Sequence, residues 1–121
     1  MHVLVVDDSR SVRLLVGHAL RRAGHEVTEA RDGAEALQAA VSADPACVVC
    51  DVNMPRMDGF EFLERLRDLP GHGRTPVVML TTECCDQAVR RGQAAGVRTW
   101  IVKPFSPEQL VEAVTRAAAG A

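Results

Sequence analysis

The residues of this sequence best suited to chemistry stand at the ends of its short apolar runs. They are three carboxylates, one hydroxyl and one ammonium group, from Asp7, Asp8, Asp51, Thr81 and Lys103. Carboxylates ligate metal ions or attack electrophiles, whereas a hydroxyl and an ammonium group stabilise the oxygens of an anion. Lys103 is also the only lysine among 14 basic residues. If the fold brings the ends of these runs together, we expect the five side chains to form one site.

The charges of these side chains indicate what such a site would bind. Three carboxylates and one ammonium group leave two negative charges, and a hard divalent cation neutralises them. Ligands that are all oxygen favour Mg²⁺ or Mn²⁺ over zinc or copper. The neutralised pocket would admit a phosphoryl group, and attack by a carboxylate on phosphorus gives an aspartyl phosphate. An acid after a strand can also be only a favourable charge at a helix N-terminus. That reading explains one acid but poorly explains all three together with the lysine.

Between these residues, short apolar runs alternate with stretches of helical spacing. Short apolar runs predict strands, and apolar residues three and four apart predict helices. The predicted strands cover 3–6, 27–30, 47–50, 76–80 and 99–102, and the predicted helices lie near 12–23, 34–41, 62–69, 86–95 and 107–117. Five strand–helix units joined by short connections predict an α/β fold with one parallel sheet, covered by helices on both faces.

The order of the strands decides whether the five side chains meet. We expect a flavodoxin-like (βα)5 three-layer sandwich with strand order 2-1-3-4-5, in which strands 1, 3, 4 and 5 are neighbours. Ligands bind beyond the carboxyl ends of the strands in such sheets. Local signals support the helices: Ser106 before Pro107 predicts an N-cap, and Gly24 predicts the end of the first helix. Gly92 is expected to weaken the fourth helix by about 1 kcal/mol.

Length and composition restrict the class of protein. The 121 residues, with 47% hydrophobic and 25% charged side chains, indicate one globular domain spanning 1–121. A formal net charge of −2 argues against a nucleic-acid partner. No apolar run approaches the roughly 20 residues of a membrane span. The first residues carry two acids and no basic segment, so we expect no signal peptide and a cytoplasmic protein.

Four segments together resemble one protein family. They are Val5–Ser9, Asp51–Gly59, Leu80–Glu83 and Trp100–Phe105. In this order and at this spacing they resemble the receiver domains of response regulators in bacterial two-component signalling, and among these the single-domain chemotaxis (CheY) type. The resemblance covers essentially the whole chain.

The resemblance implies roles for the acidic residues. Asp51 would be the phosphoacceptor and would also contact Mg²⁺. Asp8 would ligate the ion directly, Asp7 would do so through water, and the backbone carbonyl of Asn53 would complete the protein ligands. Thr81 would bind the phosphoryl group and shift on activation.

The resemblance also assigns the remaining positions. Lys103 would pair with the phosphoryl group, and the Lys103–Pro104 peptide bond would be cis. Trp100 stands where the family usually has a Tyr or Phe that switches on activation, so its coupling to Thr81 is expected to differ. Asn53 and Glu83 would set the lifetime of the phosphate, although Glu83 can equally be a solvated acid in the first turn of a helix. The β-branched Thr82 would narrow access to the phosphate.

The four cysteines invite metal or redox interpretations. Cys47 and Cys50 are three apart on a strand, so they point to opposite faces and are expected to be buried hydrophobic residues. Cys84 and Cys85 lie where the fourth helix begins, and helix N-termini lower the pKa of thiols. A redox input there is a minority hypothesis.

The expected function is therefore a signalling phosphoacceptor and not an enzyme. The implied partners are a sensor histidine kinase and a downstream protein, such as the flagellar motor switch, with the chain acting as a monomer. A receiver of another pathway or a phosphate sink are alternatives within the family. A small aspartyl-phosphate phosphatase of the haloacid-dehalogenase type is the alternative from another class. The Asp7–Asp8 pair and the chain length argue against that enzyme.

Overall fold

The structure, a computed structural model, describes residues 1–82, 86–94, 96–97 and 99–120. The strands are β1 (His2–Val6), β2 (Glu26–Ala30), β3 (Cys47–Asp51), β4 (Val77–Thr81) and β5 (Thr99–Val102). The helices are α1 (Arg10–Arg22), α2 (Gly33–Ala43), α3 (Gly59–Arg67), α4 (Asp86–Ala94) and α5 (Pro107–Ala119). All ten predicted elements are present. Within the described ranges, no helix has both the length and the apolar character needed to cross a membrane.

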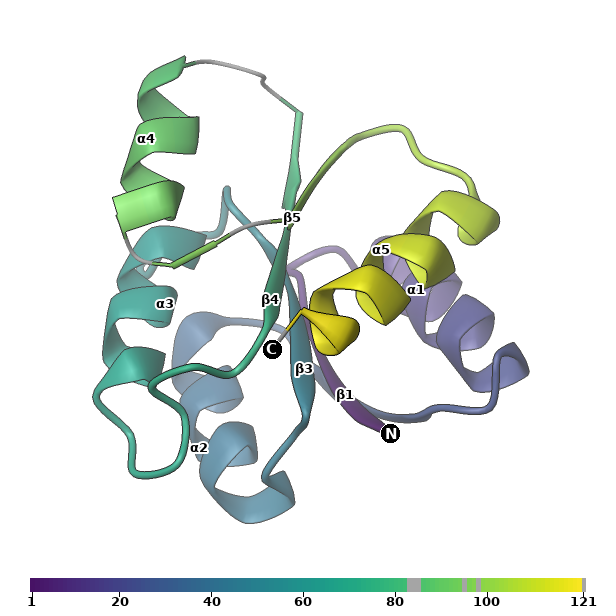
Figure 1. Ribbon diagram of the computed structural model, residues 1–121, viewed down its shortest axis with the longest axis horizontal. Coiled ribbons are helices and arrows are strands. Elements are labelled where there is room, and N and C mark those ends of the chain that lie inside the picture. Colours follow the sequence, from purple (N-terminus) through teal and green to yellow (C-terminus); the bar gives the residue numbers. More distant parts are fainter. Residues whose placement is uncertain (83–85, 95, 98, 121) are drawn as a thin grey trace.

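The five strands form one parallel sheet in the order β2-β1-β3-β4-β5. Helices α1 and α5 cover one face of this sheet, and α2, α3 and α4 lie on the other (Figure 1). The predicted fold class and strand order are confirmed. Because all strands run in the same direction, their carboxyl ends share one edge of the sheet, where ligands bind in folds of this kind.

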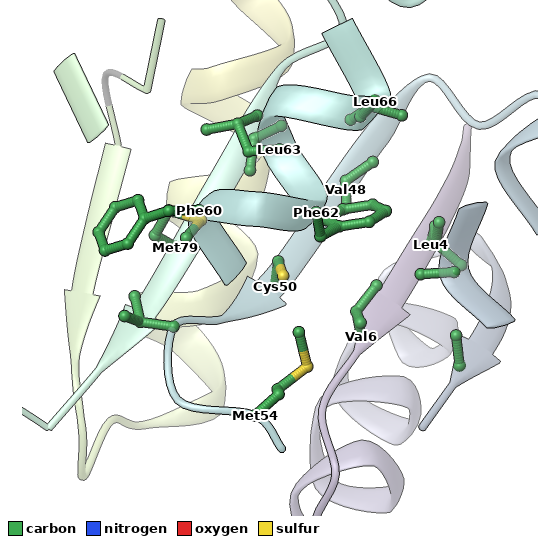
Figure 2. Packing of buried hydrophobic residues seen from close by; sticks show 14 of the residues in the cluster. Leu4, Val6, Val48, Cys50, Met54, Phe60, Phe62, Leu63, Leu66 and Met79 are labelled. Carbon is green, nitrogen blue, oxygen red and sulfur yellow. The ribbon is translucent and has the colours of Figure 1, made fainter. Parts of the chain in front are cut away.

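Two apolar clusters hold the sheet between its helices. On the side of α2 and α3, Phe62, Leu63 and Leu66 pack against strand residues such as Cys50 (Figure 2). On the side of α1 and α5, the cluster includes Cys47. Every residue of β3 and β4 is buried, as is typical of central parallel strands. Cys47 and Cys50 therefore face opposite sides, as predicted.

Side-chain caps determine where several helices begin. Ser106 accepts a hydrogen bond from the backbone N–H of Gln109, whose side chain accepts one from the N–H of Ser106. Asp58 likewise accepts from the N–H of Glu61 at 2.9 Å. The apolar spacing predicts the third helix from residue 62, but the cap at Asp58 starts α3 three residues earlier, at Gly59.

Gly92 makes room for the indole of Trp100 between α4 and the sheet. A Cβ atom at Gly92 would overlap Cζ2 of Trp100 and would lie 3.4 Å from Cε1 of Phe60. The Phe60 and Trp100 ring centroids are 6.1 Å apart with the planes tilted by 51°. The guanidinium carbon of Arg91 lies 4.8 Å from the Phe60 centroid. Gly92 therefore has a packing role in addition to its expected cost to the helix.

The replacement Gly92→Ala tests this packing. Alanine favours the helix by about 1 kcal/mol, but its methyl group must displace the indole, and overpacking costs typically 1–3 kcal/mol. We expect a net loss of about 1 kcal/mol in the free energy of unfolding, measured with urea. Trp100 emission should also shift to the red, because the indole moves toward solvent.

Gly17→Ala in α1 is the matched control. A Cβ atom there would meet only the flexible end of Arg21 at 3.2 Å and a Val27 methyl at 3.7 Å. This variant should be as stable as the wild-type chain or more stable. If Gly92→Ala matches Gly17→Ala in stability and keeps the wild-type emission, the indole does not depend on the missing side chain.

Candidate functional site

Three carboxylates converge at the carboxyl edge of the sheet. Asp7 and Asp8 directly follow β1, and Asp51 is the last residue of β3. One carboxylate oxygen from each of the three lies within 4.8 Å of the others. Asp7 and Asp51 are 0% and 5% exposed, whereas Asp8 is open to solvent. The predicted cluster therefore exists, with two buried acids and one exposed acid at its mouth.

Lys103 directly follows the edge strand β5 and joins this cluster. Its Nζ lies 3.2 Å from Oδ2 of Asp7 and 3.3 Å from Oδ1 of Asp51. The backbone N–H of Lys103 donates to the carbonyl of Thr81 at 2.8 Å, and the peptide bond to Pro104 is cis, as expected. Burial opposes the ammonium charge, but the carboxylates of Asp7 and Asp51 prevail and raise the pKa of Lys103.

The pKa of Asp51 is raised above its ordinary value. Burial is the main cause, and the negative charge of Asp7 adds to it. Lys103 and a hydrogen bond from the backbone N–H of Asn53 act in the opposite direction without cancelling the shift. The ionised form of Asp51 is therefore disfavoured without a cation, and a bound cation would stabilise it.

The loop after β3 holds Asp51 by its backbone. The N–H of Val52 donates to the carbonyl of Leu80, and the N–H of Gly59 donates to the carbonyl of Val52. A Cβ atom at Gly59 would overlap the carbonyl oxygen of Asp51, so only glycine fits there. The sequence shows Gly59 only as a turn residue, because this contact with Asp51 arises from the tertiary fold.

The remaining predicted residues lie at different distances from this cluster. Thr81 ends β4 and is buried, and Thr82 follows it on the surface. Asn53 is exposed in the loop after β3. Trp100 pairs with Met79 in the sheet, two positions before the register pair of Thr81 and Val102. Its indole nitrogen is buried and finds no hydrogen-bond partner within the described part of the chain.

Three predicted residues fall outside what the structure describes. They are Glu83, Cys84 and Cys85. Cys50 is buried, and its thiol donates to the backbone carbonyl of Asp51 at 3.3 Å. Burial, together with nearby acids, raises the pKa of the Cys50 thiol, and burial raises that of Cys47 to about 11. Both described cysteines therefore act as buried apolar residues, as predicted.

The donors of the cluster fit a hard divalent cation. All three side chains offer oxygen, and with Lys103 included the cluster carries two net negative charges. Such a set suits Mg²⁺ better than a soft metal. The exposed Asp8 leaves the cluster open on the side from which an ion and a phosphoryl donor can approach.

Comparison with known proteins agrees with this geometry. A structure of the chemotaxis response regulator CheY4 of Vibrio cholerae matches with a TM-score of 0.91 and 46% identity, over 96% of this chain and 97% of that one. A structure of a putative response regulator from Chloroflexus aurantiacus matches with a TM-score of 0.90 and 36% identity, over 98% and 97% of the two chains.

Curated relatives are longer than this chain. The transcriptional regulatory protein SrrA of Staphylococcus aureus is 37% identical over 109 residues, which are 90% of this chain and 44% of SrrA. The chain thus spans less than half the length of such relatives.

The profile of the response regulator receiver domain matches residues 3–115. With that match covering nearly the whole sequence, this chain belongs to the response regulator receiver domain family, whose members are signalling domains of two-component systems.

Proposed function

We propose that this chain is a receiver that accepts a phosphoryl group on Asp51 from a sensor histidine kinase, with Mg²⁺ as cofactor and Mn²⁺ as a substitute. The observation that carries the proposal is the convergence of Asp7, Asp8 and Asp51 within 4.8 Å, with Lys103 3.3 Å from Asp51. The proposal also assigns the hydroxyl of Thr81, at the end of β4, to the phosphoryl group and the backbone carbonyl of Asn53, in the loop after β3, to the metal ion.

In the proposed reaction, a carboxylate oxygen of Asp51 attacks the phosphorus of a phosphohistidine. The new O–P bond forms as the P–N bond breaks, and the imidazole leaves and takes up a proton. Lys103 stabilises the transferred oxygens by its charge, and the Thr81 hydroxyl donates a hydrogen bond to them. Bound Mg²⁺ would neutralise the negative charge of the site and of the phosphoryl group. Asp7, Asp8, Asp51 and the Asn53 carbonyl would hold the ion, Asp7 through water.

The phosphoryl group is a signal, and its loss resets the chain. Hydrolysis of the aspartyl phosphate releases inorganic phosphate and restores the Asp51 carboxylate. The residues proposed to set its lifetime are Asn53 and Glu83, which the family resemblance assigns to the path of the attacking water, and Thr82, whose β-branch would narrow access to the phosphate. The chain thus promotes only its own phosphorylation and dephosphorylation, unlike an enzyme with a separate substrate.

Intact-mass measurement with acetyl phosphate and Mg²⁺ tests this reaction. The wild-type chain should gain the mass of one phosphoryl group, and Asp51→Asn should gain none. Asp8→Ala should need roughly tenfold or more additional Mg²⁺ for the same yield, since it removes a charged ligand. Full incorporation into Asp51→Asn would show that another residue is the acceptor.

Release of phosphate from a small ester tests the phosphatase alternative. A haloacid-dehalogenase-type enzyme would hydrolyse small phosphate esters over many turnovers, whereas a receiver releases at most the phosphate that it first bound to Asp51. Sustained release from an ester such as p-nitrophenyl phosphate, lost in Asp51→Asn, would favour the enzyme.

Among pathways, we infer chemotaxis. The support is the 46% identity over nearly full length to the chemotaxis response regulator CheY4 of Vibrio cholerae. The curated relatives named transcriptional regulators match over less than half of their length. A receiver of another pathway or a phosphate sink is the alternative. The proposal includes one receiver domain over residues 1–121, a monomer in the cytoplasm, and a protein target such as the flagellar motor switch.

We place the output surface on α4, β5 and α5. A groove of about 440 Å³ lies between β5 and α5, and Thr99, Trp100 and Val102 are among the residues that line it. Trp100 belongs both to this groove and to the packing with Gly92 of α4. Movement of Thr81 toward a phosphoryl group would thus change the surroundings of Trp100 and shift the population between two arrangements of this surface.

Amide hydrogen exchange with and without beryllofluoride tests the output surface. We expect changed protection in residues 86–94 and 107–119 as well as around Asp51, because the phosphoryl mimic draws Thr81 and Lys103 toward it. Asp51→Asn with beryllofluoride is the control and should show no change. Protection that changes only in the loops around Asp51 would exclude α4, β5 and α5 as the output surface.

A further inference from the structure

We propose that Arg13, anchored by Glu29, is a positioning residue for the carboxylate of Asp8. The inference rests on the proposed function, because it assigns a task within the same metal site. Arg13 touches neither the phosphoryl group nor the ion in this scheme. It acts through the backbone that joins Asp7 to Asp8.

The contact of Arg13 joins α1 to the segment after β1 that carries Asp7 and Asp8. Nη1 of Arg13 donates a hydrogen bond to the backbone carbonyl of Asp7, with a length of 2.6 Å. The Arg13 side chain is only 15% exposed. A charged donor in such a half-buried place makes a stronger hydrogen bond than a neutral one. The Asp7 carbonyl is therefore held firmly at this point.

This carbonyl matters because of the peptide bond to which it belongs. The carbonyl of Asp7 and the N–H of Asp8 share one planar peptide unit, so fixing the oxygen fixes the direction in which the chain continues to Asp8. The other polar groups of Asp7 are bonded too. Its N–H donates to the carbonyl of Ala30, Oδ1 accepts from the N–H of Ser9, and Oδ2 pairs with Lys103. The hydrogen bond from Arg13 fixes the remaining polar group of Asp7, the carbonyl that leads to Asp8.

Glu29 holds Arg13 in its turn. Val5 of β1 pairs with Glu29 of β2 in the sheet. Oε1 of Glu29 lies 3.6 Å from Nε of Arg13, and Oε2 lies 3.6 Å from Nη2 of Arg21. Because Nε faces Glu29 while Nη1 faces Asp7, the planar guanidinium bridges the two groups in one orientation. Lysine, with one nitrogen at its end, cannot reproduce that arrangement.

Charge and positioning predict opposite effects of removing Arg13. If the guanidinium acted on the site only through its positive charge, neutralising it would leave the carboxylates more negative and would raise the affinity for Mg²⁺. If it orients Asp8, its removal lowers that affinity. Outer residues that orient metal ligands typically contribute 10–100-fold to affinity. The sign of the change therefore separates the two roles.

The experiment is a Mg²⁺ titration by calorimetry of the full chain and its variants, followed by phosphoryl incorporation from acetyl phosphate. We expect Arg13→Gln to bind Mg²⁺ roughly tenfold more weakly, and Arg13→Lys to be weakened as well. At saturating Mg²⁺, incorporation into both variants should approach that of the wild-type chain, because Asp51 is unchanged. Urea unfolding in EDTA checks that each variant is folded in the metal-free state from which the titration starts.

Arg21→Gln is the matched control, because Arg21 lies on the same helix and contacts the same Glu29 but not Asp7. It should bind Mg²⁺ with wild-type affinity or more tightly. Equal or tighter binding by Arg13→Gln, or full rescue by Arg13→Lys, would overturn the positioning role alone. A wild-type chain that neither binds Mg²⁺ nor takes a phosphoryl group would overturn the proposed function and this inference with it.

Discussion

The mutual repulsion of three carboxylates at one edge of the sheet is the constraint on which this structure depends. Asp7 and Asp51 are almost fully buried, and one oxygen of each lies within 4.8 Å of the other and of Asp8. Lys103 balances only part of this charge. Burial, with the negative charge of Asp7 adding to it, raises the pKa of Asp51. Such a cluster could hold a metal ion, which the proposed phosphoryl transfer requires.

The rest of the fold keeps these groups from separating. Buried strands β1 and β3 fix Asp7 and Asp51 in adjacent positions, and apolar clusters on both faces of the sheet hold the strands. The close approach of Gly59 to the Asp51 carbonyl allows no other side chain. After the edge strand β5, the hydrogen bond from the backbone N–H of Lys103 to the carbonyl of Thr81 fixes the backbone that carries the ammonium group. Rigid elements thus hold the charged groups close together against their mutual repulsion.

The fold class, the strand order and the acidic cluster could be predicted from the sequence, because apolar runs mark strands and polar residues directly follow them. The apolar spacing places the start of α3 three residues too late, although Asp58 three residues before Glu61 is a signal for a helix start. The contacts of Gly92 with Trp100 and of Arg13 with Asp7 leave no pattern in the sequence, because each depends on side-chain directions that only the folded structure sets. The assigned roles of Asn53 and Thr82 remain predictions, as does that of Glu83, which lies outside the described residues.

The most direct test of the central claim is the stability of Asp51→Asn relative to the wild-type chain, measured by urea unfolding in EDTA and in saturating Mg²⁺. Because the pKa of Asp51 is raised, its ionisation costs stability as the pH rises through that pKa, and asparagine avoids this cost. In EDTA at neutral pH the variant should be more stable than the wild-type chain, by a margin that shrinks as the pH falls. In Mg²⁺ the wild-type chain should gain about 2.7 kcal/mol at an ion concentration of 100 times Kd, and the variant should gain less. A variant that is less stable in EDTA and gains as much from Mg²⁺ as the wild-type chain would contradict the account.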